Sequence, residues 1–539
     1  MSGLKILLYR PPARHHVTVF PQKTFPLGLL SIAGMLRHHG FTEVRLIDGF
    51  EGYNGEDLAR EARDWQPDVV GISGLTAHAY DGMAAAQMVK EAAPGTLIVA
   101  GGIHFSAVPD ETLRVCPHID LVAVGEGEMT FLELCQSLPS SPAQHDWRTS
   151  LSAVAGLCWL AGGTEPALDE QGQANPDRPL VYTEKRKLMS DLSQLTMPAF
   201  DLTNPDRYRM HPYSWGDYVM LEGSRGCPFQ CTYCHTTQFW QKRWRPRPVE
   251  AILDEVEYSV RQMGRRAIHF TDDSWATRRD RVIAFCEGIL SRGLDVDIWA
   301  QCRVDDLYRD RDLFGLMKRA GFYGFLIGFE SGEQQALDRW KKGVEVDKAR
   351  AIAPLLTEHF DSIIGTFFIG DWETTAESFE ATRLYSREIG VDIFIEAPLT
   401  LFPPTIPIWK AYESRGLKME WDYDQIGNCK VILPTGTLDR DAVLDLQKRN
   451  MAGFYTDPKK AWHALSSGPH SARQFSTMIF SGLEDAVRER ARTTIPAHWR
   501  GRSVVLRREY RDRHLQFAAA RPMPSYDSKS WSGPSHSAA

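Results

Sequence analysis

Short apolar runs alternate with amphipathic stretches along the first 140 residues. Runs such as Lys5–Tyr9 and Val69–Ser73 are typical of buried strands, whereas apolar residues at helical spacing in Leu27–His39 and Tyr80–Ala92 indicate helices. Strands that alternate with helices predict an α/β fold with a doubly wound parallel sheet. Ligands bind such sheets at the carboxyl ends of the strands, so the loops that follow the strands are candidate binding positions.

A second alternation of strands and helices begins near residue 213. Five or six βα units in about 200 residues predict a partial (β/α)6 barrel rather than a small open sheet. Its strands are expected at Tyr218–Glu222, Ala267–Thr271, Asp297–Gln301, Gly324–Gly328, Ile363–Ile369 and Ile393–Glu396. One of the helices between these strands is expected at Arg309–Ala320.

The remaining parts of the chain have a different composition. Ser-Ser-Pro, Gly-Gly and Asn-Pro-Asp segments around short apolar runs predict a linker with a hairpin. A mostly helical C-terminal region is expected to close over the barrel, and a tail rich in Ser, Pro and Gly is expected to be disordered. The resulting division is a first domain at 1–140, a linker at 141–212, a barrel at 213–430, the helical region at 431–520 and the tail at 521–539.

Charge and hydropathy narrow the class of protein. The 539 residues carry a formal net charge of -7, and Lys and Arg are spread along the chain, which argues against a nucleic-acid partner. The N-terminal apolar run is too short for a signal peptide, and no run approaches a membrane span. We therefore expect a cytoplasmic protein without stable membrane association.

Three of the nine cysteines, Cys227, Cys231 and Cys234, lie within eight residues at the spacing C-x3-C-x2-C. In the cytoplasm thiols stay reduced, so this group favours metal binding over disulfides. Zinc is one interpretation, with His235 as a fourth ligand, but structural zinc normally needs a second ligand pair farther along the chain. An iron–sulfur cluster with one iron free of protein ligands is the favoured interpretation.

The motif CPFQCTYC, preceded by Ser224-Arg-Gly226 and followed by a partial barrel, resembles the radical S-adenosylmethionine (SAM) superfamily. The first domain, with PLGLLSIAGMLRHHG, VRLID, PDVVGIS, VAGGIH and VAVGEGEMTF, resembles the cobalamin-binding domain that precedes this barrel in one large class of that superfamily. Together the resemblances cover about residues 4–430. They imply a [4Fe–4S] cluster on Cys227, Cys231 and Cys234, with SAM bound to the fourth iron.

The resemblance also implies contacts with SAM. Tyr233 would pack near the adenine, Glu330 would contact the ribose or the methionine part, and Arg303 would face the SAM carboxylate. Asp273, or its neighbour Asp272, would touch SAM or the substrate. Two structural alternatives remain open. The aspartates could cap the helix before Arg279, and Arg303 and Glu330 could form structural ion pairs inside the barrel.

For cobalamin the resemblance implies contacts from three loops that follow strands of the first domain. Many cobalamin-binding folds carry Asp-x-His-x-x-Gly, whose His is the lower cobalt ligand, but the loop after Asp48 reads Asp48-Gly-Phe-Glu-Gly-Tyr53 without a His. A domain that only packs on the barrel, and a core or capping role for His104, are the alternatives. The implied contacts are Ser73, Thr76, Gly101, Gly102, His104, Gly125, Glu126, Gly127 and Glu128.

The function implied by the resemblance is radical chemistry at an unactivated carbon. The reduced cluster would cleave SAM to a 5′-deoxyadenosyl radical, with an external one-electron donor such as ferredoxin or flavodoxin. C-methylation of a small-molecule or tetrapyrrole substrate is the first expectation. An oxidative cyclase of the anaerobic magnesium-protoporphyrin monomethyl ester cyclase type is the alternative, and a non-catalytic cobalamin or iron–sulfur carrier or sensor is the third.

Overall fold

The fold comes from a computed structural model. The described residues are 3–12, 22–139, 146–162, 168, 175, 177–210, 217–400, 408–417, 422–426, 433–459, 462 and 502–519. The tail expected to be disordered, 521–539, therefore lies outside the described residues.

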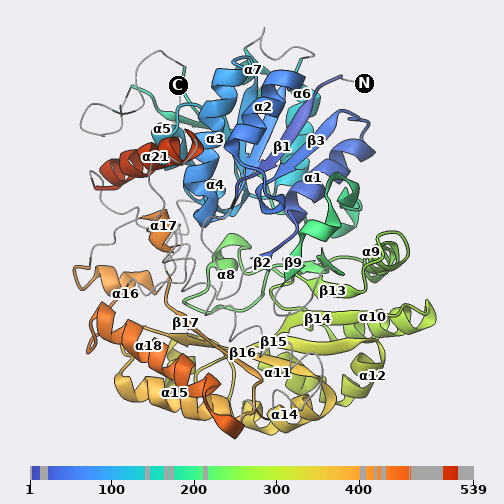
Figure 1. The fold of residues 1–539 in the computed structure, drawn as a ribbon, viewed down its shortest axis with the longest axis vertical. Coiled ribbons are helices and arrows are strands. Elements are labelled where there is room, and N and C mark those ends of the chain that lie inside the picture. The colour runs from blue at the N-terminus through green and yellow to red at the C-terminus, as the bar shows by residue number, and fades with distance from the viewer. Residues whose placement is uncertain are drawn as a thin grey trace.

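The first domain is built on a seven-stranded sheet, at the top of Figure 1. Five neighbouring strands run parallel, and the chain order reverses at β1, which lies between β3 and β4. This reversal confirms the predicted doubly wound sheet. In spatial order the parallel strands are β3 (Val44–Asp48), β1 (Ile6–Arg10), β4 (Val69–Ser73), β5 (Leu97–Gly101) and β6 (Leu121–Ala123).

Helices cover both faces of this sheet because alternate strand residues point to opposite sides. Leu7 and Tyr9 of β1 belong to the hydrophobic core under α2 and α3, whereas Ile6 and Leu8 belong to the core under α1 and α6. The helices of the domain are α1 (Leu27–His38), α2 (Gly55–Trp65), α3 (Ala79–Ala92), α4 (Gly102–Ala107), α5 (Pro109–Val115) and α6 (Gly127–Ser137).

The second domain is a six-stranded parallel sheet with helices on its outer side, at the bottom of Figure 1. The spatial order equals the chain order, as in part of a βα barrel. The strands are β10 (Tyr218–Leu221), β13 (Ala267–Phe270), β14 (Asp297–Cys302), β15 (Phe322–Glu330), β16 (Ser362–Ile369) and β17 (Ile393–Pro398).

The barrel helices surround these strands and share one large hydrophobic core with them. The expected helix near 309–320 divides into a short 3-10 turn followed by α12 (Phe314–Arg319). The other barrel helices are α9 (Val249–Arg261), α10 (Arg279–Ser291), α11 (Val304–Arg309), α13 (Gln334–Arg339), α14 (Val346–His359) and α15 (Ala376–Glu388).

The hairpin expected in the linker exists, and it extends the first sheet. Strand β7 (Leu157–Leu160) pairs antiparallel with β6, and β8 (Leu180–Tyr182) pairs antiparallel with β7. The hairpin therefore belongs to the core of the first domain, with Leu157 buried in it.

The helical C-terminal region does not simply close over the barrel. Helix α18 (Arg440–Tyr455) packs against α15 and β17, but α21 (Arg502–Ala519) returns to the first domain and packs against α3 and α5. Its Leu506, Tyr510 and Phe517 join the core of that domain, which is why the helix docks there. The expectation that the whole region covers the barrel is corrected accordingly.

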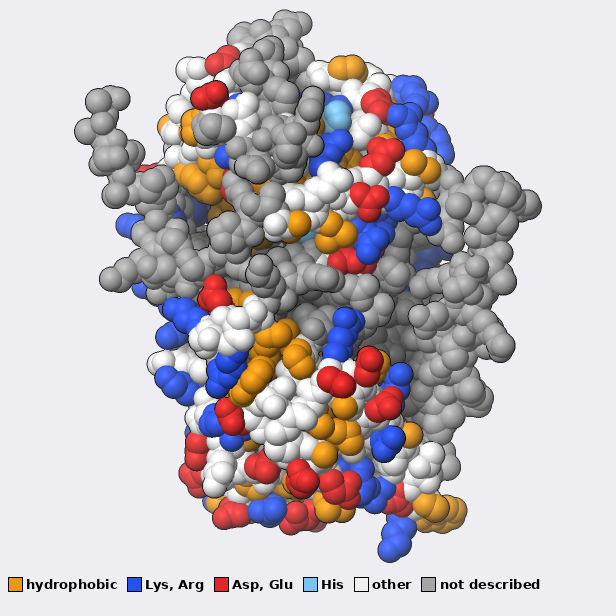
Figure 2. All heavy atoms as spheres, turned by 90° about the vertical axis from the view of Figure 1, so that its left-hand side faces the viewer, with side chains coloured by type: hydrophobic (Ala, Val, Ile, Leu, Met, Phe, Trp, Pro, Cys, Tyr) orange, Lys and Arg blue, Asp and Glu red, His pale blue; other side chains and the backbone are white. Residues whose placement is uncertain are grey.

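One face of the molecule is mixed in charge. Figure 2 shows acidic and basic side chains interspersed on the face that carries the C-terminal helices, with apolar side chains between them. No helix among the described residues has the length and apolar character needed to cross a membrane.

Candidate active site between the two domains

The three-cysteine loop follows the first barrel strand. Cys227 and Cys231 are buried and Cys234 is partly exposed; α8 (His235–Phe239) begins directly after Cys234 and lies between the two domains in Figure 1. Burial raises the pKa of the Cys227 thiol to about 11. Burial also raises the pKa of Cys234, and the neighbouring thiols add to the rise at Cys227 and at Cys234. A bound metal would be needed to hold these two side chains as thiolates.

The chain in front of Cys227 is fixed by the barrel. Asp272, at the carboxyl end of β13, accepts hydrogen bonds from the Gly223 backbone N–H at 2.8 Å and from Ser224 Oγ at 2.5 Å. Gly226 follows with a φ of +86°, and a Cβ there would lie 2.1 Å from the Arg243 carbonyl oxygen. Only glycine fits this position, so the path of the chain into Cys227 is tightly defined.

Tyr233 packs against two aromatic side chains of the barrel, and its expected contact with the adenine of SAM stays a prediction. Its ring stacks on Phe368 of β16, with centroids 4.3 Å apart, and meets Trp340 edge to face at 5.9 Å. Burial raises the pKa of its hydroxyl well above the usual value, and a hydrogen bond with Glu330 adds to this effect. The cluster loop is thereby attached to the ends of β15 and β16.

Glu330 and Arg303 stand at the carboxyl ends of β15 and β14, near the cluster loop. The Lys342 ammonium donates to Glu330 Oε1 at 2.7 Å, and Arg303 pairs with Asp305 at 3.0 Å. The Arg303 guanidinium also lies over the ring of Phe229, 3.5 Å from its centroid. Each residue therefore makes an ion pair within the barrel, in line with the structural alternative, and their contacts with SAM stay a prediction.

The two aspartates do not cap the following helix. The N-cap of α10 is Arg278, which makes no side-chain cap, so the capping alternative for Asp272 and Asp273 is wrong. Asp273 instead accepts a hydrogen bond from Thr236 Oγ1 at 3.2 Å, on the first turn of α8. It stays close to the cluster loop, whereas buried Asp272 organises the backbone in front of it.

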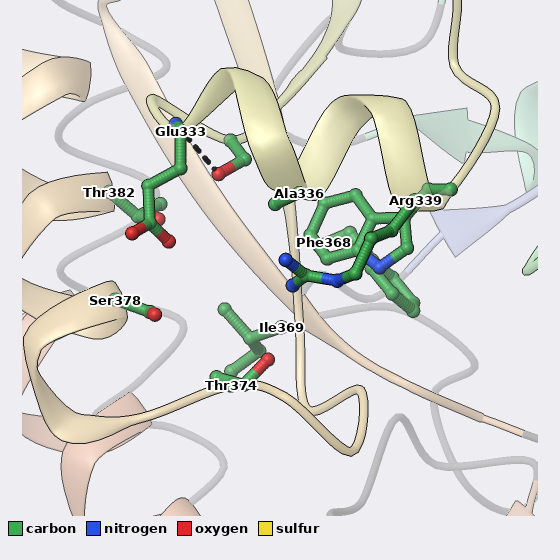
Figure 3. A pocket seen from close by; sticks show the side chains of 10 residues that line it. Glu333, Ala336, Arg339, Phe368, Ile369, Thr374, Ser378 and Thr382 are labelled. Atoms are coloured by element: carbon green, nitrogen blue, oxygen red, sulfur yellow. Dashed lines mark hydrogen bonds between the residues drawn. The ribbon is translucent and has the colours of Figure 1, made fainter. Parts of the chain in front are cut away.

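A small pocket opens beside Trp340 and Phe368 at the rim of the barrel (Figure 3). It lies between α13 and α15, and the Arg339 guanidinium and the Glu333 carboxylate point into it. Trp340 and Phe368, which pack on Tyr233, also line it. Sequence reasoning did not predict this pocket because its polar residues come from two helices that are distant along the chain.

Two loops expected to contact cobalamin end neighbouring strands of the first sheet. Ser73 ends β4 and Thr76 follows it, while Gly101 ends β5 and Gly102 and His104 follow it. Gly102 has a φ of +84°, and a Cβ there would lie 2.6 Å from Ser73 Oγ. The two loops therefore touch, and the glycine is required at their contact.

This edge of the sheet combines exposed apolar residues with buried imidazoles. Leu75 and Ile103, which follow β4 and β5, are large apolar side chains, and each is 42% exposed. Burial lowers the pKa values of His78 and His104 to about 3, so both rings are neutral. The Nε2 atoms of both have no hydrogen-bond partner within the described part of the chain.

The third loop has a different structural role. Gly125 has a φ of +94° and donates its backbone N–H to Ser106 Oγ, whereas Glu126 and Glu128 form buried ion pairs with Arg225 of the barrel. Gly127 is the first residue of α6. The ion pairs were not predicted, although acidic residues in GEGE and an arginine in SRGC were the signal available in the sequence.

The residues present fit the expected cofactors. Three soft thiol ligands in one loop suit an iron–sulfur cluster. The exposed apolar residues of the first domain, together with the Nε2 atoms that lack a partner within the described residues, suit a large ligand with apolar and polar parts. Within the described ranges, no three or more His, Cys, Asp or Glu side chains are arranged to hold a single metal ion.

Comparison with family models decides the family. The B12 binding domain model matches residues 14–135, and the Radical SAM superfamily model matches residues 221–385, which include the three cysteines. The chain is a radical SAM enzyme with a B12-binding domain. The cofactors of this radical SAM enzyme are accordingly a [4Fe–4S] cluster, SAM and cobalamin.

Curated relatives of this radical SAM enzyme have two kinds of name. The uncharacterized methyltransferase PH0819 of Pyrococcus horikoshii is 27% identical over 461 residues, which are 85% of this chain and 94% of the relative. The anaerobic magnesium-protoporphyrin IX monomethyl ester cyclase of Rubrivivax gelatinosus is 27% identical over 432 residues, which are 80% of this chain and 73% of the cyclase.

A solved structure supports the fold. The cobalamin-dependent S-adenosylmethionine radical enzyme OxsB, with aqua-cobalamin and S-adenosylmethionine bound, aligns with a TM-score of 0.63 over 95% of this chain and 84% of its own. The sequence identity is 14%, so this likeness shows that the two proteins share the arrangement of domains.

Proposed function

We propose that this enzyme transfers a methyl group to an unactivated carbon of a small-molecule or tetrapyrrole substrate. The observation that carries the proposal is the three-cysteine loop at the carboxyl end of the barrel, with α8 between it and a domain of the B12-binding family. The methyltransferase name of a relative that matches over 94% of its length supports this choice of reaction.

The overall reaction sets what the site must hold. When bound, the cluster supplies an electron that cleaves SAM, and cobalamin supplies a carrier for the methyl group. In balance, R–H, two SAM molecules and two electrons give R–CH3, 5′-deoxyadenosine, methionine and S-adenosylhomocysteine. The substrate hydrogen leaves in 5′-deoxyadenosine. We place the electron donor outside the chain, as a ferredoxin or flavodoxin, and the enzyme in the cytoplasm.

The chain's own residues bind, orient and exclude water. Cys227, Cys231 and Cys234 would hold the cluster, while the stack of Tyr233 on Phe368 gives the loop a rigid apolar wall. Arg303 would face the SAM carboxylate, and Glu330 would contact the ribose or the methionine part. The ion pairs of Arg303 with Asp305 and of Glu330 with Lys342 would hold both side chains in place for these contacts. Burial of this region keeps water from reactive species.

The first test uses protein purified without oxygen from cells supplied with cobalamin. We expect about four iron and one cobalt per chain, and cleavage of SAM to 5′-deoxyadenosine after reduction. SAM with a deuterated methyl group, supplied with a small-molecule extract of the source organism, should yield a new product that carries all three deuterium atoms. Iron without cobalt, or cleavage without label in any product, would contradict methyl transfer.

The cyclase relative favours a second reaction, oxidative ring closure or oxygen insertion. In that case the deuterated methyl group would stay out of the product, and the substrate would lose hydrogen while 5′-deoxyadenosine forms. The same incubation therefore distinguishes the two reactions. Absence of SAM cleavage by protein with a complete cluster would favour a carrier or sensor.

A further inference from the structure

A buried group of charged side chains joins the two domains directly in front of the cluster loop. Arg225 of the barrel lies 2.9 Å from Glu126 and 2.6 Å from Glu128 of the first domain. Arg245 lies 2.9 Å from the second oxygen of Glu126. All four residues are at most 8% exposed. We refer to these four residues as the interdomain clamp.

Each side of the clamp is fixed within its own domain. On the first-domain side, Ser31 Oγ donates to Glu128 at 3.0 Å, and the Met189 backbone N–H donates to Glu126 at 2.7 Å. On the barrel side, Arg225 and Arg245 are partners in the two-stranded sheet of β11 (Ser224–Arg225) and β12 (Arg245–Pro246). Neither side can adjust freely, so the clamp defines one docked arrangement of the domains.

The arginine side of the clamp leads directly into the cluster site. Arg225 is separated from Cys227 only by Gly226, whose conformation and lack of space for a Cβ were described above. Arg225 also donates to Glu222 at 2.8 Å, so its guanidinium is held from both directions. A shift of Arg225 would move the first cysteine of the loop.

The glutamate side leads to the edge where cobalamin is expected. Glu126 lies in the loop between β6 and α6, Glu128 lies in the first turn of α6, and β6 pairs with β5. The same loop is tied to α4 by the hydrogen bond from Gly125 to Ser106. A ligand that orders this edge would therefore also order the carboxylates of the clamp.

We propose that Arg225 and Glu128 are positioning residues that couple cobalamin binding in the first domain to the cluster loop of the barrel. A buried ion pair is stable only with good geometry on both partners, so the clamp exists in a docked arrangement or is broken. Coupling between two sites is reciprocal. Protein with a cluster should therefore bind cobalamin more tightly than protein without one. This inference rests on the binding of both cofactors.

The test measures the dissociation constant of hydroxocobalamin by visible absorbance, for protein with and without a reconstituted cluster. Glu128→Gln keeps the size of the side chain and the contact with Ser31 but removes the charge that faces Arg225. Tyr208→Phe is the matched control, because Tyr208 joins the domains through Asp48 Oδ2, at 2.5 Å, without contact to the cluster loop. Thermal unfolding and iron content are recorded for each variant.

For the natural sequence we expect the cluster to tighten cobalamin binding by about fivefold or more. Glu128→Gln should reduce this ratio to near one, and Tyr208→Phe should leave it unchanged. Arg225→Lys provides a second variant, since an ammonium cannot replace a guanidinium that binds two carboxylates. It should also reduce the ratio of the two dissociation constants to near one. If Glu128→Gln does not fold, the result for Arg225→Lys decides whether the clamp couples the two cofactor sites.

Two results would overturn the inference while leaving the proposed function intact. One is that the natural protein binds both cofactors, but binds hydroxocobalamin equally tightly with and without the cluster. The other is a folded clamp variant with the same ratio as the natural protein. Failure of the proposed function gives a different result, because the natural protein would then bind no cobalamin or assemble no cluster.

Discussion

The Tyr233 ring lies nearly parallel to the Phe368 ring, with centroids 4.3 Å apart and an angle of 21° between the planes. This contact attaches the cluster loop to β16. Phe368→Ala would remove the stacked ring and should cost about 3 to 5 kcal/mol in the free energy of unfolding. We also expect lower iron content after reconstitution, because the loop loses its support. Phe368→Leu is the control and should keep most of the stability and most of the iron content. Equal iron content in the natural and Ala proteins would contradict this role.

Gly226 should tolerate no side chain. Gly226→Ala places a Cβ 2.1 Å from the Arg243 carbonyl oxygen at a φ of +86°, so we expect loss of cluster assembly, measured as iron and sulfide per chain. Gly264→Ala is the matched control, since Gly264 has a φ of +66° but no atom within 4 Å of the added Cβ. That variant should lose only about 1 to 2 kcal/mol and keep its cluster. A complete cluster in Gly226→Ala would contradict the requirement for glycine at this position.

Cys231→Ala should remove the cluster and all formation of 5′-deoxyadenosine, because the remaining two thiols cannot hold the iron firmly. Cys286→Ala is the control. Cys286 is buried in α10, far along the chain from the motif, and burial raises its pKa to about 12. Its loss should cost about 1 kcal/mol in stability and leave iron content unchanged. Full iron content in Cys231→Ala would exclude Cys231 as a ligand.

Glu396 should make stability depend on pH. It is 2% exposed on β17, accepts a hydrogen bond from Asn450 at 3.0 Å, and burial raises its pKa from 4.5 to about 8. The folded state therefore holds the proton more tightly than the unfolded state. The free energy of unfolding should fall by about 4 to 5 kcal/mol as the pH rises from 4.5 to 8.

Denaturant unfolding between pH 5 and 8 measures this contribution. Glu396→Gln, which keeps an acceptor for Asn450, should flatten the decline. Glu287→Gln, at an exposed position on α10, should leave it as in the natural protein. An unchanged slope in Glu396→Gln would mean that Glu396 is ionised in the folded protein.

The sequence predicted the strands better than the helices between them. Val69–Ser73 was expected with the bounds that β4 has, because a buried parallel strand is a short apolar run with clear ends. The chain between β14 and β15 was expected to form one helix near 309–320, but it forms α11, a 3-10 turn and α12. Local pattern alone could not divide this segment, because its division depends on packing against the barrel.

The site was predictable where a motif is local and unpredictable where it depends on distant contacts. The three cysteines lie in one loop, so their spacing was sufficient to indicate a cluster. Glu126 and Glu128 were expected to contact cobalamin, but they pair with Arg225, about 100 residues farther along the chain. Nothing in the spacing of residues relates two positions so far apart, since only the docking of the domains brings them together.

Helix α21 has a consequence for the synthesis of the protein. Its Leu506, Tyr510 and Phe517 complete the core beneath α3, which was made more than four hundred residues earlier. At ribosomal rates the first domain must wait on the order of tens of seconds with this apolar surface uncovered. A helix that is synthesised late therefore completes the core of the domain that is synthesised first. During that interval the nascent protein should need chaperone protection until residue 519 has left the ribosome.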